Sequence, residues 1–307
     1  MRLIRALATA VLAWTVATTG VWAQNGLERF ERDIKPQIQL EKFTYQNPQA
    51  LGDAGFILND VTATIPADPA TGDKASTLKI DKVVVEAIDF DRMKDLADDE
   101  MPRFARMRLE GLTGDEELFS LLDPYGIPRV PIDVVLDYRI DGDAKVFTLN
   151  KLEVTLRGQG KLGLAMVMDG VTDKTSEVAN AKDDGRLRSA QLTIDDNGLL
   201  ARLLPAIAKE EGQTTDGLVA MAAISIAAFC DGQGAPTLKA LDAVASFIAD
   251  WQAPKGALTI GLQPAKTAAM ADLDKVMEPN ALVDIFGLSA SYPGTREGAA
   301  KAGAPAK

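Results

Sequence analysis

Between about residue 37 and residue 197, apolar and polar residues alternate with a period of two. The longest case places six apolar side chains on one parity, namely Val130, Ile132, Val134, Leu136, Tyr138 and Ile140. Mostly charged residues fill the positions between them, which is typical of a strand with one buried and one wet face. Similar alternation predicts strands near 60–65, 106–110, 162–168 and 189–195.

Two of the predicted strands change phase. In 78–90 the apolar parity switches near Asp81, and in 147–156 it switches near Asn150. Because a shift of one residue turns every later side chain to the other face, we expect bulges or short turns at these two residues.

Glycine-rich turn signals separate the predicted strands. They lie at 140–143, 157–160 and 184–185, and the first two are expected to close β-hairpins. A short helix is predicted over 115–122, while 91–100 is either a second short helix or an acidic loop.

After Asn197 the apolar period becomes about 3.6, which predicts helices. Residues 195–198 supply N-cap chemistry for a helix from about Leu199, which Pro205 should kink or divide. A second helix, capped by Thr214 or Thr215, is apolar nearly all round and is therefore expected to be central. A third helix is predicted over 236–251. Short helices at 272–277 and 280–286 and strands at 258–262 and 288–292 complete the pattern.

Strands with one apolar face need a cover, and the helices offer apolar surface for that purpose. The sequence therefore predicts an α+β fold, in which a broad twisted antiparallel sheet has a C-terminal helix cluster packed on its apolar face. We find no alternation of strands and helices of the βαβ kind, which argues against a Rossmann-type or barrel enzyme.

The first 23 residues have the layout of a secretory signal peptide. Arg2 and Arg5 precede the uncharged stretch 6–21, and Val21 and Ala23 offer small side chains for a cleavage site. We expect cleavage after Ala23 and a periplasmic or secreted protein. The alternative is an uncleaved anchor, for which the stretch is short. No transmembrane segment is expected after cleavage.

The rest of the chain is expected to form a single α+β domain over 24–292. Its strand-rich part is 37–197 and its helix-rich part is 198–286. The remaining segment, 293–307, is rich in Gly, Ala, Pro and Lys, and this composition predicts a disordered tail.

The composition excludes several kinds of catalytic and metal-binding site. The chain has no histidine, and its one cysteine is Cys230. Catalytic triads that contain histidine, imidazole metal sites and multi-cysteine metal sites are therefore ruled out. Cys230 ends an apolar run and is expected to be a buried small hydrophobe, because no basic neighbour in the sequence would activate it. The net charge of −11 argues against nucleic acid and anionic membrane surfaces as partners.

The motifs that remain have simple structural interpretations. The acidic groups at 141–143, 195–196 and 98–100 lack the spacing of a calcium loop and indicate a hairpin turn, a helix cap and a solvated run. The glycines of 157–163 lie between two strands, whereas a phosphate loop needs a following helix. We therefore expect no cofactor, no metal site and no catalytic residues. A carboxylate-dependent hydrolase remains a third hypothesis.

Apolar side chains are the remaining candidates for a site. Flexible methionines and bulky aromatic residues can line a cavity for an apolar ligand, although they can also simply fill the core. The candidate ligand-binding residues are Met166, Met168, Met221, Phe229, Phe247 and Trp251.

The layout of the chain carries a resemblance to a family. The segments that carry it are 109–112, 152–160 and 192–200, followed by three helices. In these features the chain resembles uncharacterised secreted proteobacterial proteins of a family of unknown function. At the level of architecture, a curved sheet covered by helices is also similar to periplasmic lipid-handling folds such as LolA-like carriers. The resemblance implies no functional residue, because fold alone does not fix function.

These observations together predict a non-enzymatic periplasmic protein. It is expected to bind an apolar or lipid-like ligand between sheet and helices. The alternative is an envelope protein that binds a protein partner through an exposed sheet edge or apolar patch.

Overall fold

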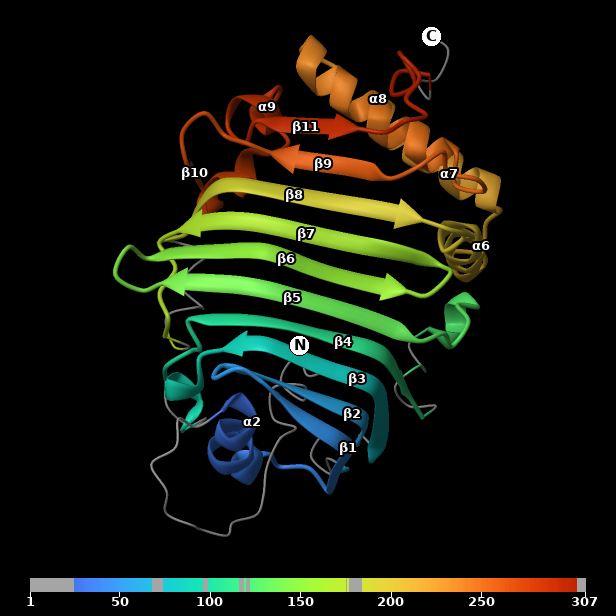
Figure 1. Cartoon of the computed structure of the whole chain (residues 1–307). Helices are drawn as coiled ribbons and strands as arrows, with labels where there is room; N and C mark the ends of the chain where they lie inside the picture. The colour runs from blue at the N-terminus through green and yellow to red at the C-terminus, as the bar shows by residue number, and fades with distance from the viewer. Residues whose placement is uncertain are drawn as a thin grey trace.

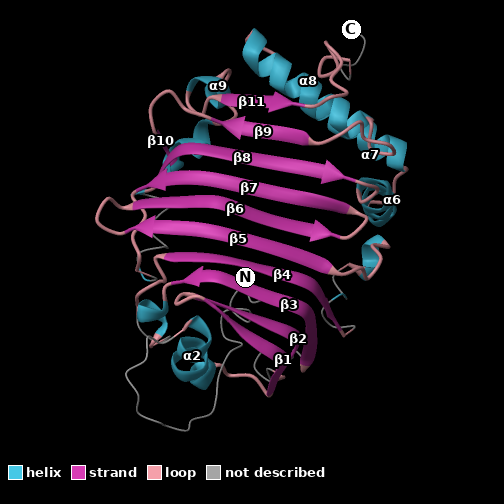
Figure 2. Ribbon diagram, in the orientation of Figure 1, coloured by secondary structure: helices cyan, strands magenta, loops and turns pink. Residues whose placement is uncertain are grey.

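The computed structural model describes residues 25–67, 74–95, 99–115, 119, 122–174, 176 and 184–302. Within them the chain forms one wide, curved sheet of eleven strands, accompanied by helices (Figures 1 and 2). All its printed pairings are antiparallel. The predicted α+β class with a broad antiparallel sheet is confirmed. The predicted signal peptide, 1–23, lies outside the described residues.

The strands follow one another across the sheet in chain order. The order is β1-β2-β3-β4-β5-β6-β7-β8-β9-β11, and β10 pairs with β8 away from this path. The strands are β1 (Lys42–Leu51), β2 (Gly55–Ile65), β3 (Ser76–Ile88), β4 (Phe104–Gly114), β5 (Ile132–Asp141), β6 (Val146–Leu156), β7 (Gly160–Asp169), β8 (Arg186–Asp196), β9 (Leu258–Leu262), β10 (Ala268–Ala269) and β11 (Leu288–Ser291). The hairpins predicted at 140–143 and 157–160 join β5 to β6 and β6 to β7.

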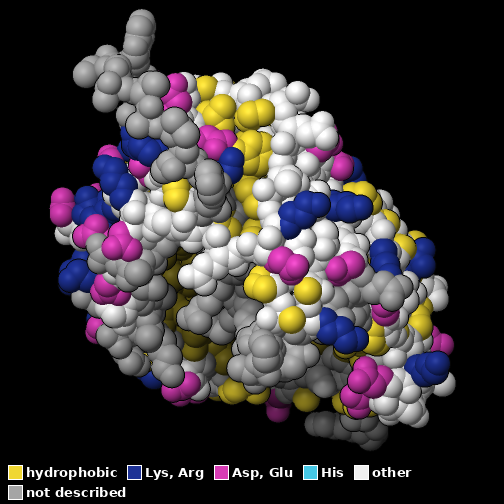
Figure 3. Space-filling model, turned by 90° about the horizontal axis from the view of Figure 1, so that it is seen from below, with side chains coloured by type: hydrophobic (Ala, Val, Ile, Leu, Met, Phe, Trp, Pro, Cys, Tyr) yellow, Lys and Arg dark blue, Asp and Glu magenta, His cyan; other side chains and the backbone are white. Residues whose placement is uncertain are grey.

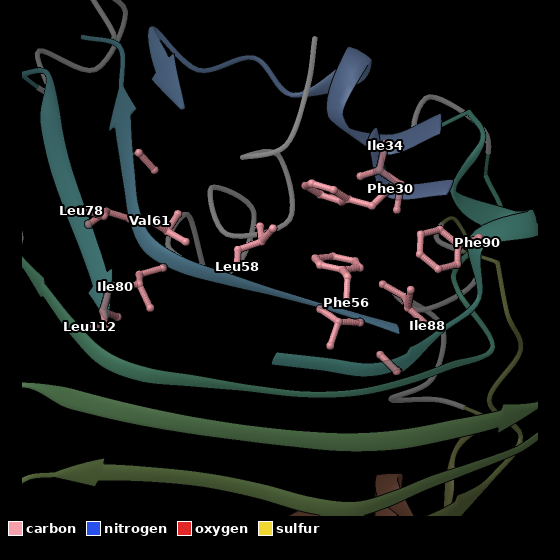
Figure 4. Close-up of a cluster of buried hydrophobic side chains, with 13 residues drawn as sticks. Phe30, Ile34, Phe56, Leu58, Val61, Leu78, Ile80, Ile88, Phe90 and Leu112 are labelled. Carbon is pink, nitrogen blue, oxygen red and sulfur yellow. The ribbon is translucent and has the colours of Figure 1, made fainter. Parts of the chain in front are cut away.

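The phase change predicted near Asp81 is real and is shared by three strands. β3 continues through Asp81 without a turn, yet Ile80 and Val85, which have opposite parity, enter the same buried cluster. The neighbouring positions are Asp60 in β2 and Gly111 in β4, and both have left-handed backbone, with φ of 49° and 69°. The apolar side chains therefore stay on the inner side where the sheet bends (Figure 4).

The second predicted irregularity, at Asn150, is a β-bulge. Asp137 pairs with Lys151 and the next residue, Tyr138, pairs with Leu149, so that Asn150 is the extra residue. The side-chain nitrogen of Asn150 donates a hydrogen bond of 3.1 Å to Asp137 Oδ1. This bulge keeps the apolar residues of β6 on one face before and after it.

A short helical segment at the N-terminal end packs inside the bend of the sheet. It consists of α2 (Gly26–Arg29), the π-helix η1 (Phe30–Ile34) and the 3₁₀ helix η2 (Lys35–Gln37). Phe30 stacks on Phe56 of β2 with ring centroids 4.3 Å apart, and Phe90 of η3 (Phe90–Met93) joins them (Figure 4). Of the predicted helix over 115–122, most residues lie outside the described ones.

Three longer helices follow β8. They are α6 (Leu200–Glu210), α7 (Thr215–Phe229) and α8 (Ala235–Ala249), close to the predicted ranges. Asp196 caps α6 by accepting the Leu200 N–H at 2.9 Å, and Thr214 caps α7 by accepting the Gly217 N–H at 3.1 Å. Pro205 lies inside one continuous α6 and does not divide it. The smaller elements are η4 (Asp123–Tyr125), η5 (Met270–Lys275) and α9 (Ala281–Asp284).

The position of α7 contradicts the expectation of a central helix. α7 packs against α6 and α8, and its Met221 and Ile224 remain 56% and 48% exposed. Of the three longer helices, α8 is the one that packs closely on the sheet, against β9 and β11. An apolar composition indicates that a helix needs partners, but it does not say how many partners the chain supplies.

The C-terminal segment is also more ordered than its composition indicates. Residues 293–302 were expected to belong to a disordered tail, but they pack on α8. Asp242 accepts the N–H groups of Gly298 and Ala300 at 2.9 and 2.8 Å, and Ser246 Oγ accepts the Arg296 N–H at 2.9 Å. Polar side chains of α8 thus satisfy backbone groups of a segment that has little apolar surface of its own.

Gly111 provides a test of the phase change. A Cβ at this position would lie 1.9 Å from Asp81 Oδ2, and the φ of 69° strains any other L-residue. We expect Gly111→Ala to lower the free energy of unfolding by about 1–2 kcal/mol in urea titrations.

The matched control is Gly163→Ala in β7. A Cβ there meets Thr193 at an ordinary 3.8 Å and the backbone is extended, so stability should be nearly unchanged. Equal losses in the two variants would show that the left-handed position is not special.

Candidate functional site: the inner face of the sheet

One face of the sheet is apolar from β3 to β11. Register places inward-pointing side chains in rows that cross the strands. One row contains Val85, Met107, Leu136, Leu152, Leu164, Leu192, Ile260 and Ala290. We call the face that carries this row the inner face. Because neighbouring strands lie about 4.8 Å apart, the row is a continuous apolar surface.

Both ends of the inner face are covered. At the N-terminal end, Phe30 and Ile34 of η1 pack on β2, β3 and β4. At the C-terminal end, Phe247 of α8 packs on Leu258 of β9 and meets Tyr292 edge to face, with centroids 5.4 Å apart. Beside it, Phe286 packs against Leu187 and Ala268. These clusters form the buried core at the two ends.

The middle of the inner face is less covered. Here six side chains form what we call the central strip, namely Leu136, Leu152, Leu162, Leu164, Met166 and Leu192. Leu162 is 47% exposed, and the other five are each only half-buried. The buried clusters found among the described residues stop on either side of this strip. Figure 3 views the molecule from the side of β1, and hydrophobic side chains gather around a hollow on that side.

The outer face of the same strands is charged. Arg108 lies 2.8 Å from Glu86, Arg106 lies 3.3 Å from Asp137, and Arg157 lies 2.7 Å from Asp133. Hydrogen bonds from Arg157, and a further one from the Gly111 N–H, lower the pKa of the Asp133 carboxyl below its usual value against the opposing effect of burial. The outer face is therefore suited to water, and the apolar surface is confined to the inner face.

A cluster of ion pairs holds together the chain connections at one end of the strands. Asp173 lies 2.9 Å from Arg92 and 2.7 Å from Arg103, and it follows β7, whereas the arginines lie between β3 and β4. Burial raises the pKa of Asp173, but the hydrogen bond from Arg103 and the charges of both arginines outweigh it, and the net pKa is lowered. A carboxylate that is stabilised in this way fastens the two connections to each other.

Tyr138 is the polar group on the inner face of β5. Its hydroxyl donates a hydrogen bond of 3.1 Å to the carbonyl of Pro102. Burial, with a contribution from the charge of Asp89, raises the pKa of Tyr138 to about 12, so this side chain is neutral at physiological pH. The hydroxyl therefore adds no charge to the face.

The six predicted ligand-binding residues do not lie together. Met166 and Met168 share the inner face of β7, and Met168 contacts the cluster around Phe286. Phe247 is buried in the core under α8, with 4% exposure. Met221 faces solvent on α7, and Phe229 and Trp251 are half-buried at the ends of α7 and α8.

The leucines of the central strip were not among the predicted site residues. The period of two had placed Leu136 and Leu164 on an apolar face, so the signal for the face was present. The sequence does not show which part of this face the helices cover and which part they leave partly exposed. That depends on where α8 packs, and among the described elements α8 packs mainly on β11 and β9.

Other kinds of site were sought among the described residues. Among them no three His, Cys, Asp or Glu side chains come together as metal ligands, and no helix is long and apolar enough to cross a membrane. Cys230 is buried as predicted. Burial and the charge of Asp242 raise the pKa of its thiol, which disfavours the reactive thiolate.

Comparison with known proteins adds one match. A family model described only as "Uncharacterized protein" matches residues 153–293, from β6 to just past β11. This fits the resemblance to a family of unknown function. No curated protein matches the chain. The matched segment contains α8 and the part of the sheet that α8 covers.

The cluster around Asp173 gives a testable prediction. Asp173→Asn removes the charge that both arginines share, and we expect it to lower the free energy of unfolding by about 2 kcal/mol at neutral pH. Because the folded pKa of Asp173 is lowered, its contribution is present above the unfolded pKa and is lost as the pH falls through the folded pKa. The difference between wild type and variant should therefore shrink at pH values below about 4.

The control is Asp123→Asn, which removes a similar but more exposed partner of Arg129. Urea titrations over a range of pH should find this variant close to wild type. A loss for Asp173→Asn that does not change with pH would contradict an electrostatic role.

Proposed function

We propose that this protein is an exported, non-enzymatic binding protein that holds an apolar or lipid-like molecule on the central strip. The observation that carries the proposal is the partly exposed strip between the covered ends of an otherwise continuous apolar face. Contiguous exposed apolar surface is costly in water and commonly marks a binding surface. The uncharged stretch 6–21 after Arg2 and Arg5 supports export to the periplasm or beyond.

The chemistry of the strip favours a hydrocarbon over a polypeptide. Strands β5, β6 and β7 are paired on both sides, so their backbone groups have no capacity left for an added strand. A peptide laid on the inner face would bury its own N–H and C=O groups without partners, which is unfavourable. An acyl chain has no such groups, and each methylene taken out of water contributes about 0.8 kcal/mol.

A substitution on one face of β7 tests the proposal. Leu164→Asn keeps the size of the side chain but places an amide in the centre of the strip, and we expect it to weaken binding of an apolar ligand by about ten-fold or more. The measurement is native mass spectrometry of protein purified from the exported fraction without detergent. Wild type should carry an adduct that denaturation removes, and the variant should lack it.

The matched control is Val167→Thr, a similar polar replacement on the outer face of the same strand. It should retain the adduct. If wild type carries no adduct and does not bind diphenylhexatriene, a fluorescent hydrocarbon, the proposal is wrong.

A second candidate function is binding of a protein partner in the cell envelope. The observation in its favour is the exposed apolar side of α7, with Met221 and Ile224.

Substitution of both by Ser should leave stability nearly unchanged, because both side chains are largely in water already. If α7 is the partner surface, cross-linking of the exported protein in cells will yield one adduct of fixed mass. This adduct will disappear in the α7 variant and persist in Leu164→Asn. The opposite pattern would exclude the α7 surface.

A further inference from the structure

The inner face of β5, β6 and β7 carries no charged side chain at any of its described positions. The residues of β5 are Ile132, Val134, Leu136, Tyr138 and Ile140, and β6 and β7 continue the pattern with Phe, Leu, Val, Met and one Gly. All charged residues of these three strands lie on the outer parity, as Asp133 and Lys161 do. The strip therefore has no group that could neutralise a charged ligand.

Several of the charged or polar groups near the ends of these strands already have partners. At one end, Arg92 and Arg103 share Asp173. At the other end, Asp196 accepts the Leu200 N–H at 2.9 Å, and Arg202 Nε donates to Gln159 Oε1 at 3.0 Å. Recruiting one of these groups for a ligand would break an existing contact, which offsets the gain.

From this arrangement we infer that the site recognises its ligand by the hydrocarbon chain alone and takes a long uncharged chain in preference to an ionised one. The inference rests on the proposed function and names its ligand class. An ionised head group placed on the strip would lose its hydration without finding a counter-charge. Such a head group must stay in water and adds nothing to affinity, whereas a hydroxyl or ester end can follow the chain onto the face at much lower cost.

The test is a matched series of ligands with one chain length. Dodecanol, methyl dodecanoate and dodecanoate compete with diphenylhexatriene for the purified protein, at a mildly alkaline pH that keeps the acid ionised. We expect the alcohol and the ester to bind at least as tightly as the carboxylate, with affinities that do not weaken as salt is raised. Two further methylenes should raise the affinity of each by about ten-fold.

A variant gives a complementary result. Leu162 is 47% exposed, so an arginine there can reach water and should not prevent folding. Leu162→Arg adds a cation at the strip, and we expect dodecanoate to become the tightest ligand of the series. An unchanged order would place the ligand elsewhere on the molecule and overturn the inference.

The outcomes distinguish failure of the inferred ligand class from failure of the proposed function. If wild type binds dodecanoate about three-fold or more tightly than dodecanol, and salt weakens that binding, the ligand class is wrong while apolar binding stands. If no member of the series binds and diphenylhexatriene fails as well, the proposed function itself is wrong.

Discussion

The structure depends on one constraint, which is that a single face of a wide sheet must stay apolar while the sheet bends. Strand geometry alternates side chains strictly, so a bend that needs an extra residue would turn the rest of a strand inside out. The chain meets this constraint by changing phase in adjacent strands at the same place, at Asp60, Asp81 and Gly111. The bulge at Asn150 does the same for β6. Both covered ends and the central strip lie on the face that these irregularities preserve.

Much of this architecture could be predicted from the sequence, because the alternation of apolar and polar residues within each strand shows which of its side chains are buried. The hairpins, the phase changes at Asp81 and Asn150, and the final strands were predictable for that reason. The positions of the helices and of the C-terminal segment on the sheet were not predictable. The apolar composition of α7 suggested a central position, but a helix that is apolar all round has no preferred face, and its sequence does not say which element it meets. Similarly, the composition of residues 293–302 gave no sign of the carboxylate of Asp242 that holds them.

The candidate site shows the same division between local and long-range information. Met166 was predicted for its flexibility and lies on the central strip, whereas Phe247 was predicted for its size and is part of the core. The residues that surround Met166 and Phe247 in the sequence do not show which of the two is buried in the core. The difference arises because α8 packs on β9 and β11 and leaves β5 to β7 without a closely packed helix among the described elements. Side-chain type selects candidates, and only the packing of distant elements decides which of them remain accessible.

The order of the strands has a consequence for how the chain acquires its structure. Because each strand from β2 to β8 pairs with the one before it, these strand pairs form between segments that follow one another in the chain. A chain that is synthesised from its N-terminus can add strands one at a time, starting from the bend around Phe56. The helix that covers the far end, α8, emerges after eight of the strands have formed, so a broad apolar surface is bare in the meantime. A bare apolar surface of this kind favours aggregation until α8 covers its far end.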